Sequence, residues 1–379
     1  MTGAAGRDGR DGGSEDVAIR LEGVSKVFPG STTPAVRELS LEVPKGTLTA
    51  LVGPSGCGKT TTLKMINRLI EPTSGRILVD GRDARDRPVH ELRRDIGYVI
   101  QQVGLFPHQT VATNIGTVPR LLGWDKARVR ERVTELVDLV GLDERLLRRY
   151  PAELSGGQQQ RVGVARALAA DPPVLLMDEP YSAVDPIVRG HLQDELLALQ
   201  ARVQKTIVLV THDIDEAIKL ADRIAILAVG GVLEQYGTPE ELLRRPANEF
   251  VERFLGRERG LKRMALLKVR DVPLSPGAAV AAEASPEEAK EVMARFGVDW
   301  VGVLDGERLR GWAAARDLDG IEAVGDAPVE RFVSWVTPDA ALREALDTIV
   351  TSRTRAAVVL EADRYVGMVF LEQIAEGVE

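Results

Sequence analysis

The sequence contains one cysteine, no long hydrophobic run and no excess of positive charge. Because Cys57 stands alone among 379 residues, no disulfide can form within the chain, and a reducing, intracellular setting is expected. No apolar run approaches the roughly 18 residues of a transmembrane helix, and the first residues lack the apolar stretch of a signal peptide. We therefore expect a cytosolic protein that acts at a membrane only through a partner.

The charge limits the possible binding partners, and the length indicates the number of domains. The formal net charge is −8, which disfavours general electrostatic binding to nucleic acid or to an anionic membrane. A chain of 379 residues is long for one hydrophobic core, so two domains are the first expectation. Residues 1–16 are rich in glycine and aspartate and are predicted to form a disordered leader before the globular pattern begins at Val17.

The N-terminal part of the chain predicts an α/β fold with a mainly parallel sheet, because apolar runs alternate with helical stretches. The runs typical of buried strands are residues 47–53, 95–100, 173–178 and 206–213. Between residues 125 and 149, Val129, Val133 and Val137 recur at a four-residue spacing, which predicts an amphipathic helix inserted between strands. Residues 242–270 are charged and weakly periodic, which is typical of a connector.

The clearest motif is "GPSGCGKT", which fits the phosphate-binding pattern G-x-x-x-x-G-K-[ST] between a predicted strand and a predicted helix. Its glycines let backbone N–H groups curl around phosphate oxygens. Lys59 adds a positive charge for the β- and γ-phosphates, and Thr60 offers a hydroxyl to Mg²⁺. The predicted ATP-binding residues are Gly53, Pro54, Ser55, Gly56, Cys57, Gly58, Lys59, Thr60 and Thr61.

Polar residues that follow three other apolar runs are candidates for a nucleotide-hydrolysing site. Asp178 can hold Mg²⁺ as Walker-B aspartates do, and Glu179 is placed to orient or deprotonate the attacking water. His212 can hydrogen-bond a γ-phosphate, and the amide of Gln101 can reach Mg²⁺ or water. Each of them alone could equally be a turn, capping or loop residue. Beside a phosphate loop, the catalytic interpretation is favoured.

A second glycine turn, "LSGGQ" from Leu154 to Gln158, enters another helix-like stretch far downstream of the first. A helix N-terminus attracts phosphate through its free N–H groups and its dipole. The turn has no lysine and no threonine that could serve Mg²⁺. The turn therefore predicts a phosphate contact but lacks the groups of a complete ATP site.

Taken in order, "GPSGCGKT", "LSGGQQQR", "VLLMDEP", "SAVD" and "THD" resemble the ATP-binding cassette (ABC) family, over residues 17–256. In that family two cassettes work head to tail, and "LSGGQ" of one cradles the ATP held by the other. The resemblance implies a homodimer of this chain. Its residues that would bind ATP in trans are Ser155, Gly156, Gly157 and Gln158.

The same resemblance assigns roles to single residues. Phe28 would stack on adenine, where the family more often has Tyr or Trp. Glu179 would be the catalytic carboxylate, His212 the switch histidine, and Gln101 the glutamine that contacts Mg²⁺ and the membrane subunit. Asp185 closes "SAVD", where the family usually has "SALD", and would link the two sites of the dimer. The implied cofactors are ATP and Mg²⁺, the latter held by Thr60, Gln101 and Asp178.

One cassette without a membrane span resembles the ATPase subunit of an importer whose permease and solute-binding protein are separate chains. The stretches "TLKMINRLIEPTSGRI" and "QQVGLFPHQTVATNIGTVPRLLGW" resemble the branch that takes up quaternary amines such as glycine betaine, carnitine and choline. The chain would lie at the cytoplasmic face of the cell membrane, with the permease docked beside residues 103–114, where Phe106 is either a contact or core. An importer of another solute, such as a polar amino acid, stays open. A soluble non-transport ABC ATPase is less favoured, given the negative charge.

The C-terminal part contains a weak internal repeat. Residues 300–318 align without gaps with residues 356–374, and each copy follows a predicted helix with a start signal, at Ser285 and Thr337. The repeat resembles a pair of CBS (cystathionine-β-synthase-type) motifs. We expect a linker over residues 257–278 and a small α+β regulatory pair over residues 279–379.

The expected role of the pair is regulation, because it contains no phosphate loop, no histidine and no cysteine. Three readings stay open: an adenosine-type nucleotide, a response to ionic strength, and a dimerisation scaffold. Asp317 stands where such motifs carry the acidic residue that grips ribose, whereas the second copy has Phe370 and Gln373 at the corresponding positions. At most one nucleotide site is therefore expected.

Overall fold

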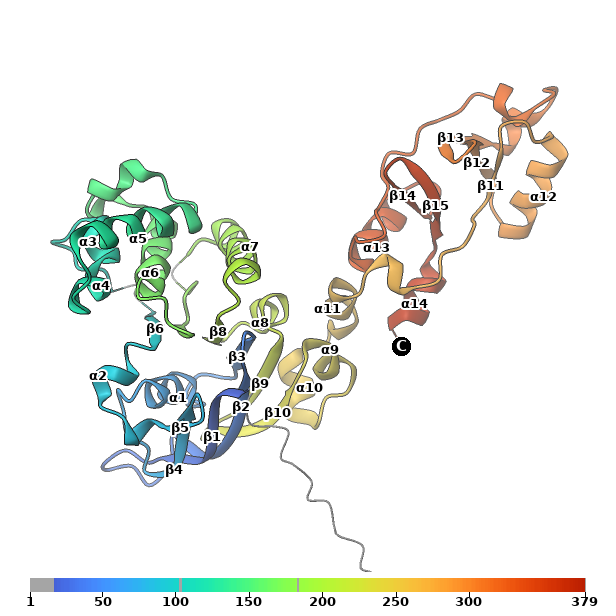
Figure 1. Cartoon of the computed structure of the whole chain (residues 1–379). Coiled ribbons are helices and arrows are strands. Elements are labelled where there is room, and N and C mark those ends of the chain that lie inside the picture. Colours follow the sequence, from blue (N-terminus) through green and yellow to red (C-terminus); the bar gives the residue numbers. More distant parts are fainter. Residues whose placement is uncertain (1–16, 102–103, 183, 379) are drawn as a thin grey trace, which may run out of the picture. The chain divides into compact units, whose positions relative to one another are not determined.

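The structure, a computed structural model, describes residues 17–101, 104–182 and 184–378 (Figure 1). The predicted leader over residues 1–16 lies outside the described residues. The chain divides into two compact units between Gly256 and Arg257. Within the described ranges, no helix combines the length and the apolar character needed to cross a membrane.

The first unit is built on a six-stranded sheet with the strand order β10-β9-β3-β8-β7-β6. All neighbouring pairs are parallel except β10 with β9, so the predicted α/β class with a mainly parallel sheet is confirmed. Every residue of β3, β7 and β8 is buried, as expected for parallel strands covered on both faces. The strands are β3 Leu48–Val52, β6 Ile96–Val99, β7 Val174–Asp178, β8 Thr206–Val210, β9 Arg223–Ala228 and β10 Val232–Gly237.

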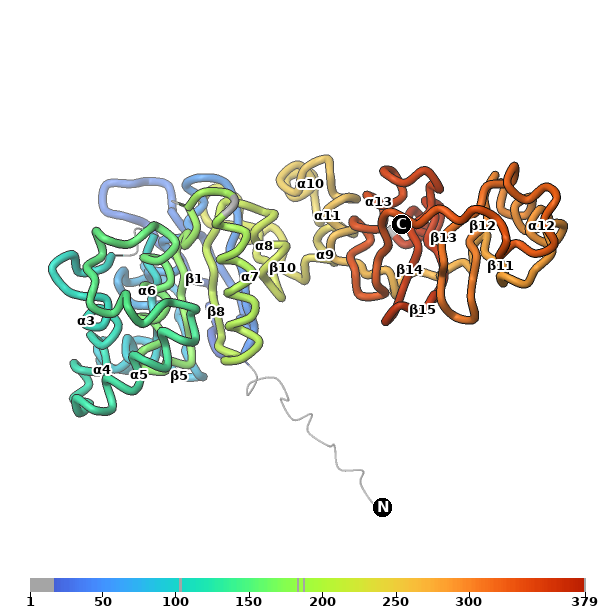
Figure 2. Tube along the Cα trace, turned by 90° about the horizontal axis from the view of Figure 1, so that it is seen from above, coloured from blue at the N-terminus to red at the C-terminus, as the bar shows by residue number. Residues whose placement is uncertain are grey.

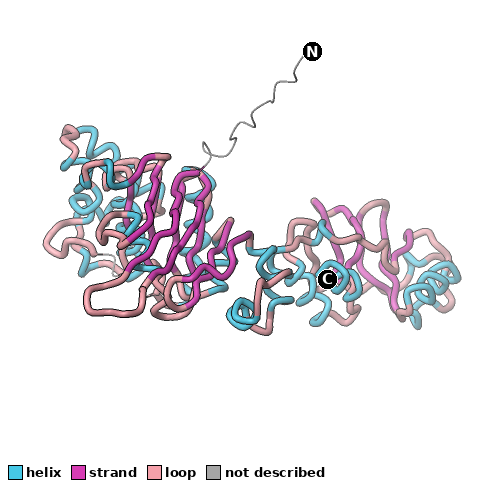
Figure 3. The backbone as a smooth tube through the Cα atoms, turned by 90° about the horizontal axis from the view of Figure 1, so that it is seen from below, coloured by secondary structure: helices cyan, strands magenta, loops and turns pink. Residues whose placement is uncertain are grey.

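A smaller antiparallel sheet packs against this one, and Figure 3 shows the strands of the unit running side by side in magenta. Its order is β2-β1-β4-β5. One hydrophobic core joins the two sheets, since Val24 and Leu39 of the small sheet belong to the same buried cluster as Leu176 and Val210 of the large one. The strands are β1 Val17–Lys26, β2 Val36–Pro44, β4 Ser74–Val79 and β5 Arg82–Asp83.

A helical insert lies between β6 and β7, and its helices gather in the green part of Figure 2. The predicted amphipathic helix is confirmed as α5, because Val129, Val133 and Val137 are all buried on one side of it. After Leu139 the chain forms short 3₁₀ turns instead of a longer helix. The helices of the insert are α3 Val111–Ile115, α4 Thr117–Leu121, α5 Lys126–Leu139 and α6 Gly156–Leu168.

The remaining helices of the first unit connect its strands or follow β10. Short turns and helices between β10 and Gly256 replace the connector expected over residues 242–270, because Leu242, Leu243, Val251 and Leu255 are buried. The helices are α1 Lys59–Ile66, α2 Val89–Leu92, α7 Pro186–Val203, α8 Ile214–Leu220, α9 Pro239–Arg244 and α10 Glu249–Leu255.

The second unit contains the two predicted copies, and their strands correspond position by position. In the ungapped alignment Val303 corresponds to Val359, and Gly311 corresponds to Gly367. The strand pairing shifts register after Val303 in the first copy and after Val359 in the second. The elements are α11 Arg259–Leu266, β11 Ala279–Ala281, α12 Pro286–Phe296, β12 Trp300–Asp305, β13 Arg308–Ala314, α13 Leu342–Thr351, β14 Ala357–Glu361, β15 Arg364–Val369 and α14 Leu371–Val378.

Each copy is joined by a single β-bridge to the segment that precedes the other copy. Glu330, which precedes the second copy, pairs with Trp312 of the first, and Ser275, which precedes the first copy, pairs with Met368 of the second. This crossing requires the aligned glycines. A Cβ on Gly311 would lie 2.2 Å from the carbonyl oxygen of Glu330, and one on Gly367 would lie 2.7 Å from that of Ser275. The pairing therefore interlocks the copies in one unit.

Two expectations for this part of the chain are corrected. Residues 257–278 belong to the second unit and are not a linker, since Val269 and Val272 are buried in its core beside Leu342. The helix expected to start at Thr337 begins at Leu342, as α13. Residues before it are held in extended pairing, with Val336 beside Val359 and Ala341 beside Lys268, which delays the first helical turn.

Candidate ATP site

The phosphate loop runs from the end of β3 to the start of α1, as the motif requires. Gly56 has a φ of +80° and Gly58 a φ of +88°, values that side chains other than glycine rarely adopt. Gly58 is the N-cap of α1, and no side chain caps this helix end. The first backbone N–H groups of α1 therefore remain available for an anion.

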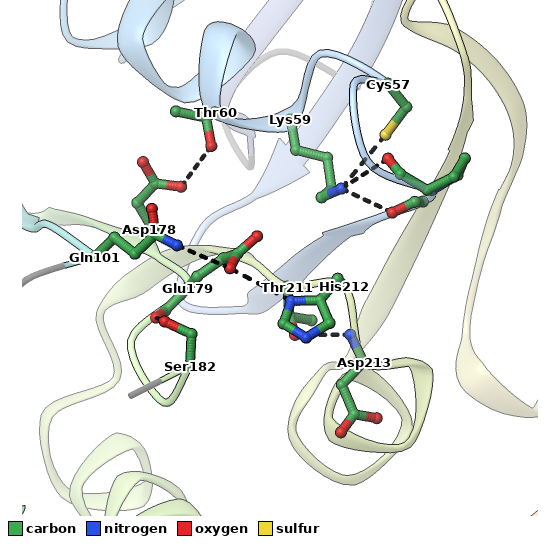
Figure 4. Close-up of polar contacts among 12 residues, drawn as sticks. Cys57, Lys59, Thr60, Gln101, Asp178, Glu179, Ser182, Thr211, His212 and Asp213 are labelled. Atoms are coloured by element: carbon green, nitrogen blue, oxygen red, sulfur yellow. Dashed lines mark hydrogen bonds and ion pairs between the residues drawn. The ribbon is translucent and has the colours of Figure 1, made fainter. Parts of the chain in front are cut away.

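Lys59 is buried, with 6% of its surface exposed, and its Nζ points into the loop. It donates to the carbonyl oxygens of Gly53 at 2.7 Å and Pro54 at 3.2 Å, and it lies 3.5 Å from Cys57 Sγ (Figure 4). The positive charge is thus held inside the ring of backbone amides. That is where the β- and γ-phosphates of a nucleotide would lie.

Two oxygen ligands suited to Mg²⁺ meet beside the loop. Thr60 Oγ1 donates to Asp178 Oδ1 at 2.8 Å, and the phenolic hydroxyl of Tyr98 lies 3.3 Å from Asp178 Oδ2. A hydroxyl and one carboxylate are what a magnesium ion needs from the protein when phosphate oxygens and water fill its other positions. These residues fit the ion, while Gln101 contacts Glu179 and not Asp178 in the described contacts.

Glu179 is the centre of a polar chain at the carboxyl end of β7. Its Oε2 accepts from Gln101 Nε2 at 3.1 Å and lies 3.3 Å from His212 Nδ1, so the three predicted catalytic residues are together (Figure 4). Glu179 has a φ of +45°, a left-handed conformation that costs a non-glycine residue on the order of 1–3 kcal/mol. Its backbone N–H donates to the Val210 carbonyl oxygen at 2.9 Å, which fixes this conformation against β8.

Residues that sequence reasoning did not identify also line the site. Tyr98 contacts Asp178 from β6, and burial together with this carboxylate raises the pKa of its phenol well above the ordinary range. Glu216 on α8 is 5% exposed, and burial followed by the charge of Asp213 raises its pKa to about 7. The sequence offers a signal for Tyr98 alone, since it lies in the predicted strand over residues 95–100 that leads to Gln101.

Comparison with known proteins places this geometry in a family. A sequence model described as "ABC transporter" matches residues 36–182. The chain is 46% identical, over 94% of its length and 95% of the relative's, to the osmoprotectant import ATP-binding protein OsmV of Salmonella typhimurium. The chain belongs to the ABC transporter family. A second relative, the glycine betaine/carnitine/choline transport ATP-binding protein OpuCA of Bacillus subtilis, is 52% identical over 79% of each chain.

Solved structures and a second family model extend the comparison. The dimeric structure of MJ0796, described as a bacterial ABC transporter cassette, is similar with a TM-score of 0.53 and 35% identity, over 58% of this chain and 98% of that one. A post-hydrolysis state of the same cassette contains ADP and phosphate. A model described as "CBS domain" matches residues 324–378. The chain is therefore an ATP-binding ABC cassette followed by a CBS domain.

The "LSGGQ" turn of this cassette forms the N-terminus of α6. The helix begins at Gly156, because Ser155 and Gln158 cap each other. Gln158 N–H donates to Ser155 Oγ at 3.3 Å, and Ser155 N–H donates to Gln158 Oε1 at 2.9 Å. Among the hydrogen bonds of the described residues, none joins Ser155, Gly156, Gly157 or Gln158 to the phosphate loop.

The other predicted site residues take no part in the described contacts of the Glu179 side chain with Gln101 and His212. Phe28 is 39% exposed, with Lys26 Nζ 5.3 Å from its ring centre, so its face is accessible to a stacking partner. Thr61 is half-buried in the first turn of α1. Asp185 is exposed, and its carbonyl oxygen accepts from Arg189 N–H at 2.8 Å. Asp317 lies in the second unit, in a 3₁₀ turn after β13.

Proposed function

We propose that this chain is the ATP-hydrolysing subunit of an ABC importer that takes up a quaternary-amine osmoprotectant such as glycine betaine, carnitine or choline. The observation that carries the proposal is the chain of contacts through Glu179, in a protein whose relatives are named for osmoprotectant, glycine betaine, carnitine and choline import. We assign hydrolysis to residues 17–256. We place the protein at the cytoplasmic face of the membrane, held there by a permease that works with a solute-binding protein.

In the proposed mechanism, the loop amides and Lys59 bind the β- and γ-phosphates, and Phe28 stacks on adenine. Bound Mg²⁺ would neutralise phosphate charge, with Thr60 and Asp178 as its protein ligands and Gln101 close by. Glu179 accepts a proton from the attacking water at the carboxylate oxygen that now faces Gln101 and His212. His212 stands on the other side of that oxygen and contacts the γ-phosphate.

A second copy would complete each site. We propose that Ser155, Gly156, Gly157 and Gln158 of one copy close on the ATP bound by the phosphate loop of the other. The dipole at the N-terminus of α6, whose Ser155 cap accepts only the N–H of Gln158 in the described contacts, favours a phosphate at this point. Asp185 would lie at the contact between the copies. The dimeric MJ0796 cassette supports this arrangement, since it is 35% identical to this chain.

The permease contact is proposed beside Phe106. Its ring is 41% exposed, while its backbone is fixed by Asn114, which is fully buried and bonds both its N–H at 2.8 Å and its carbonyl oxygen at 3.2 Å. A groove lined by Tyr98, Phe106, Val118 and Arg166 runs alongside. A fixed backbone that presents an exposed apolar ring is suited to docking a short helix.

Transport is tested by uptake of labelled glycine betaine, choline and proline in cells with and without this gene. Complementation by the native gene, and not by a Lys59→Ala version, is expected to restore uptake of a quaternary amine. Restored uptake of proline alone would support an importer of another solute. Normal uptake of every solute without the gene would contradict a role in import.

A further inference from the structure

Arg189, in the first turns of α7, connects the "SAVD" segment to the loop that carries His212. Its Nη2 donates to the Val184 carbonyl oxygen at 3.3 Å, and its Nη1 lies 3.7 Å from Asp213 Oδ2. Its backbone N–H donates to the Asp185 carbonyl oxygen at 2.8 Å. One residue therefore contacts both the end of "SAVD" and the residue directly after His212.

Asp213 is in turn fixed to its own loop. Its Oδ1 caps α8 by accepting from the backbone N–H groups of Asp215 at 2.9 Å and Glu216 at 3.3 Å, and its own N–H donates to Thr211 Oγ1 at 3.0 Å. Figure 4 shows the Asp213 carboxylate pointing away from Glu179, while the His212 ring points toward it. Since the two residues are adjacent, a shift of Asp213 changes where the ring of His212 lies.

The side chain of Arg189 lies among acidic residues. Arg189, Glu216 and the catalytic pair Glu179 and His212 line one small cavity with Tyr181, Ser182, Thr211 and Asp213. Glu216 Oε1 and Arg189 Nε are both buried without a hydrogen-bond partner in the described structure. Arg189 is the cation beside Asp213, and its removal would leave that carboxylate without this partner in the cavity it shares with Glu216.

We propose that Arg189 is a positioning residue for His212, which couples the position of the "SAVD" segment to that of the histidine loop. This inference rests on the proposed role of His212 at the γ-phosphate. A second copy that displaces the Val184 carbonyl oxygen moves the guanidinium, and the guanidinium moves the Asp213 carboxylate. The 3.3 Å contact between His212 Nδ1 and Glu179 Oε2 then depends on how the segment is seated. In this proposal Arg189 acts through Asp213 and not on the nucleotide.

The test compares steady-state ATPase kinetics of full-length variants. Arg189→Gln removes the charge, and Asp213→Asn removes its partner while keeping a good helix cap, since Asn caps as well as Asp. We expect each to lower kcat about ten- to a hundredfold, with KM for ATP little changed, because a misplaced catalytic group costs rate at this scale. Arg189→Lys should recover part of the rate, because a lysine ammonium can pair with Asp213 but lacks the second nitrogen that donates to the Val184 carbonyl oxygen.

A double variant and a matched control separate positioning from packing. Arg189→Gln combined with Asp213→Asn should be no slower than either single change, because both break the same link. Asp194→Asn breaks a different ion pair between the same two helices, in which Lys219 Nζ lies 2.7 Å from Asp194 Oδ1. It should leave kcat near that of the native chain, and thermal unfolding midpoints measured for all variants check folding.

Three results have distinct meanings. Effects of Arg189→Gln and Asp213→Asn that multiply in the double variant would overturn the coupling, as would a loss of kcat no larger than that of Asp194→Asn. A His212→Ala chain that hydrolyses ATP at the native rate would contradict the proposed site itself. An inactive His212→Ala chain beside a fully active Arg189→Gln chain would overturn only the role of Arg189.

Discussion

At the scale of single residues, the chemistry of the site follows from Glu179. The motif predicted its role, but the sequence holds no sign of its left-handed backbone or of its shared contact with Gln101 and His212. Those depend on β6, β7 and β8 lying side by side, which brings three segments far apart in the chain to one sheet edge. Tyr98 and Arg189 were not identified because their contacts with Asp178 and Asp213 join different elements of the fold, and the sequence does not show which elements meet.

Replacing Glu179 by Gln removes the oxygen that accepts the proton while leaving its shape. We expect turnover to fall by about 10²–10⁴, with nucleotide binding intact, because a positioned general base contributes on this scale. The measurement is ATPase activity alongside equilibrium binding of a fluorescent ATP analogue. Glu131→Gln, at an exposed position of α5, is the control and should behave like the native chain. Native turnover in Glu179→Gln would contradict the assignment.

The buried carboxylate of Glu216 predicts a pH-dependent stability. Its pKa in the folded chain is raised from 4.5 to about 7, first by burial and then by Asp213, so the folded state keeps a proton that the unfolded chain has released. Its contribution is therefore fully present below about pH 4.5 and is lost as the pH rises through about 7.

Urea unfolding at several pH values measures this effect. The native chain should lose stability between about pH 4.5 and 7 through this group, and Glu216→Gln, which carries no charge, should lose less over the same interval. Identical pH profiles of the two proteins would show that Glu216 does not titrate in this range.

At the scale of elements, apolar runs were sufficient to predict the buried strands, whereas local start signals were not sufficient to predict where a helix begins. β3, β7 and β8 were predictable because each is a continuous apolar run, and α5 because its valines repeat at helical spacing. The start of α13 was missed because extended pairing of Val336 and Ala341 with other strands overrides the local start signal. Tertiary pairing of this kind has no local signature.

The segment around Phe106 carries the prediction for permease docking. Replacing Phe106 by Asp puts a charge on the exposed ring position and should abolish assembly with the permease and uptake, while basal ATPase activity persists. Co-purification of the complex and ATPase assays on the isolated chain measure both. Val229→Asp, at another exposed apolar position, is the control and should leave assembly unchanged. Loss of basal ATPase activity in Phe106→Asp would mean that the ring is needed for the fold.

At the scale of the whole molecule, the chain forms two units with separate cores, and we propose that the first hydrolyses ATP and the second regulates it. The buried cluster around β1 and β7 lies in the first unit, and the clusters around α12 and α13 lie in the second. The sequence repeat predicted the paired architecture, because equivalent strands carry equivalent patterns. It could not predict that residues 257–278 join the second core, because Val269 and Val272, which are buried there, stand among charged residues in the sequence.

Truncation after Gly256 tests the division of labour. ATPase activity should persist, while its response to salt or to an adenosine-type nucleotide disappears. In the full chain, Asp317→Ala should remove only a nucleotide response, and Asp319→Ala, an exposed acid nearby, is its control. A salt response would survive Asp317→Ala, because contacts between exposed charges weaken with ionic strength whichever acid is removed. An unchanged response in the truncated chain would place the regulator in the first unit.

The central claim is that each ATP site is shared between two copies of this chain, and mixing two inactive variants tests it most directly. Ser155→Arg blocks the "LSGGQ" turn, and Lys59→Ala disables the phosphate loop. A heterodimer of the two has one site with both lesions and one with neither. If one intact site is enough for activity, the ATPase rate of an equal mixture should reach about a quarter of the native rate, since about half of the dimers carry one intact site of two. A mixture no more active than its parents would contradict the claim, as would loss of ATP binding by the Ser155→Arg monomer.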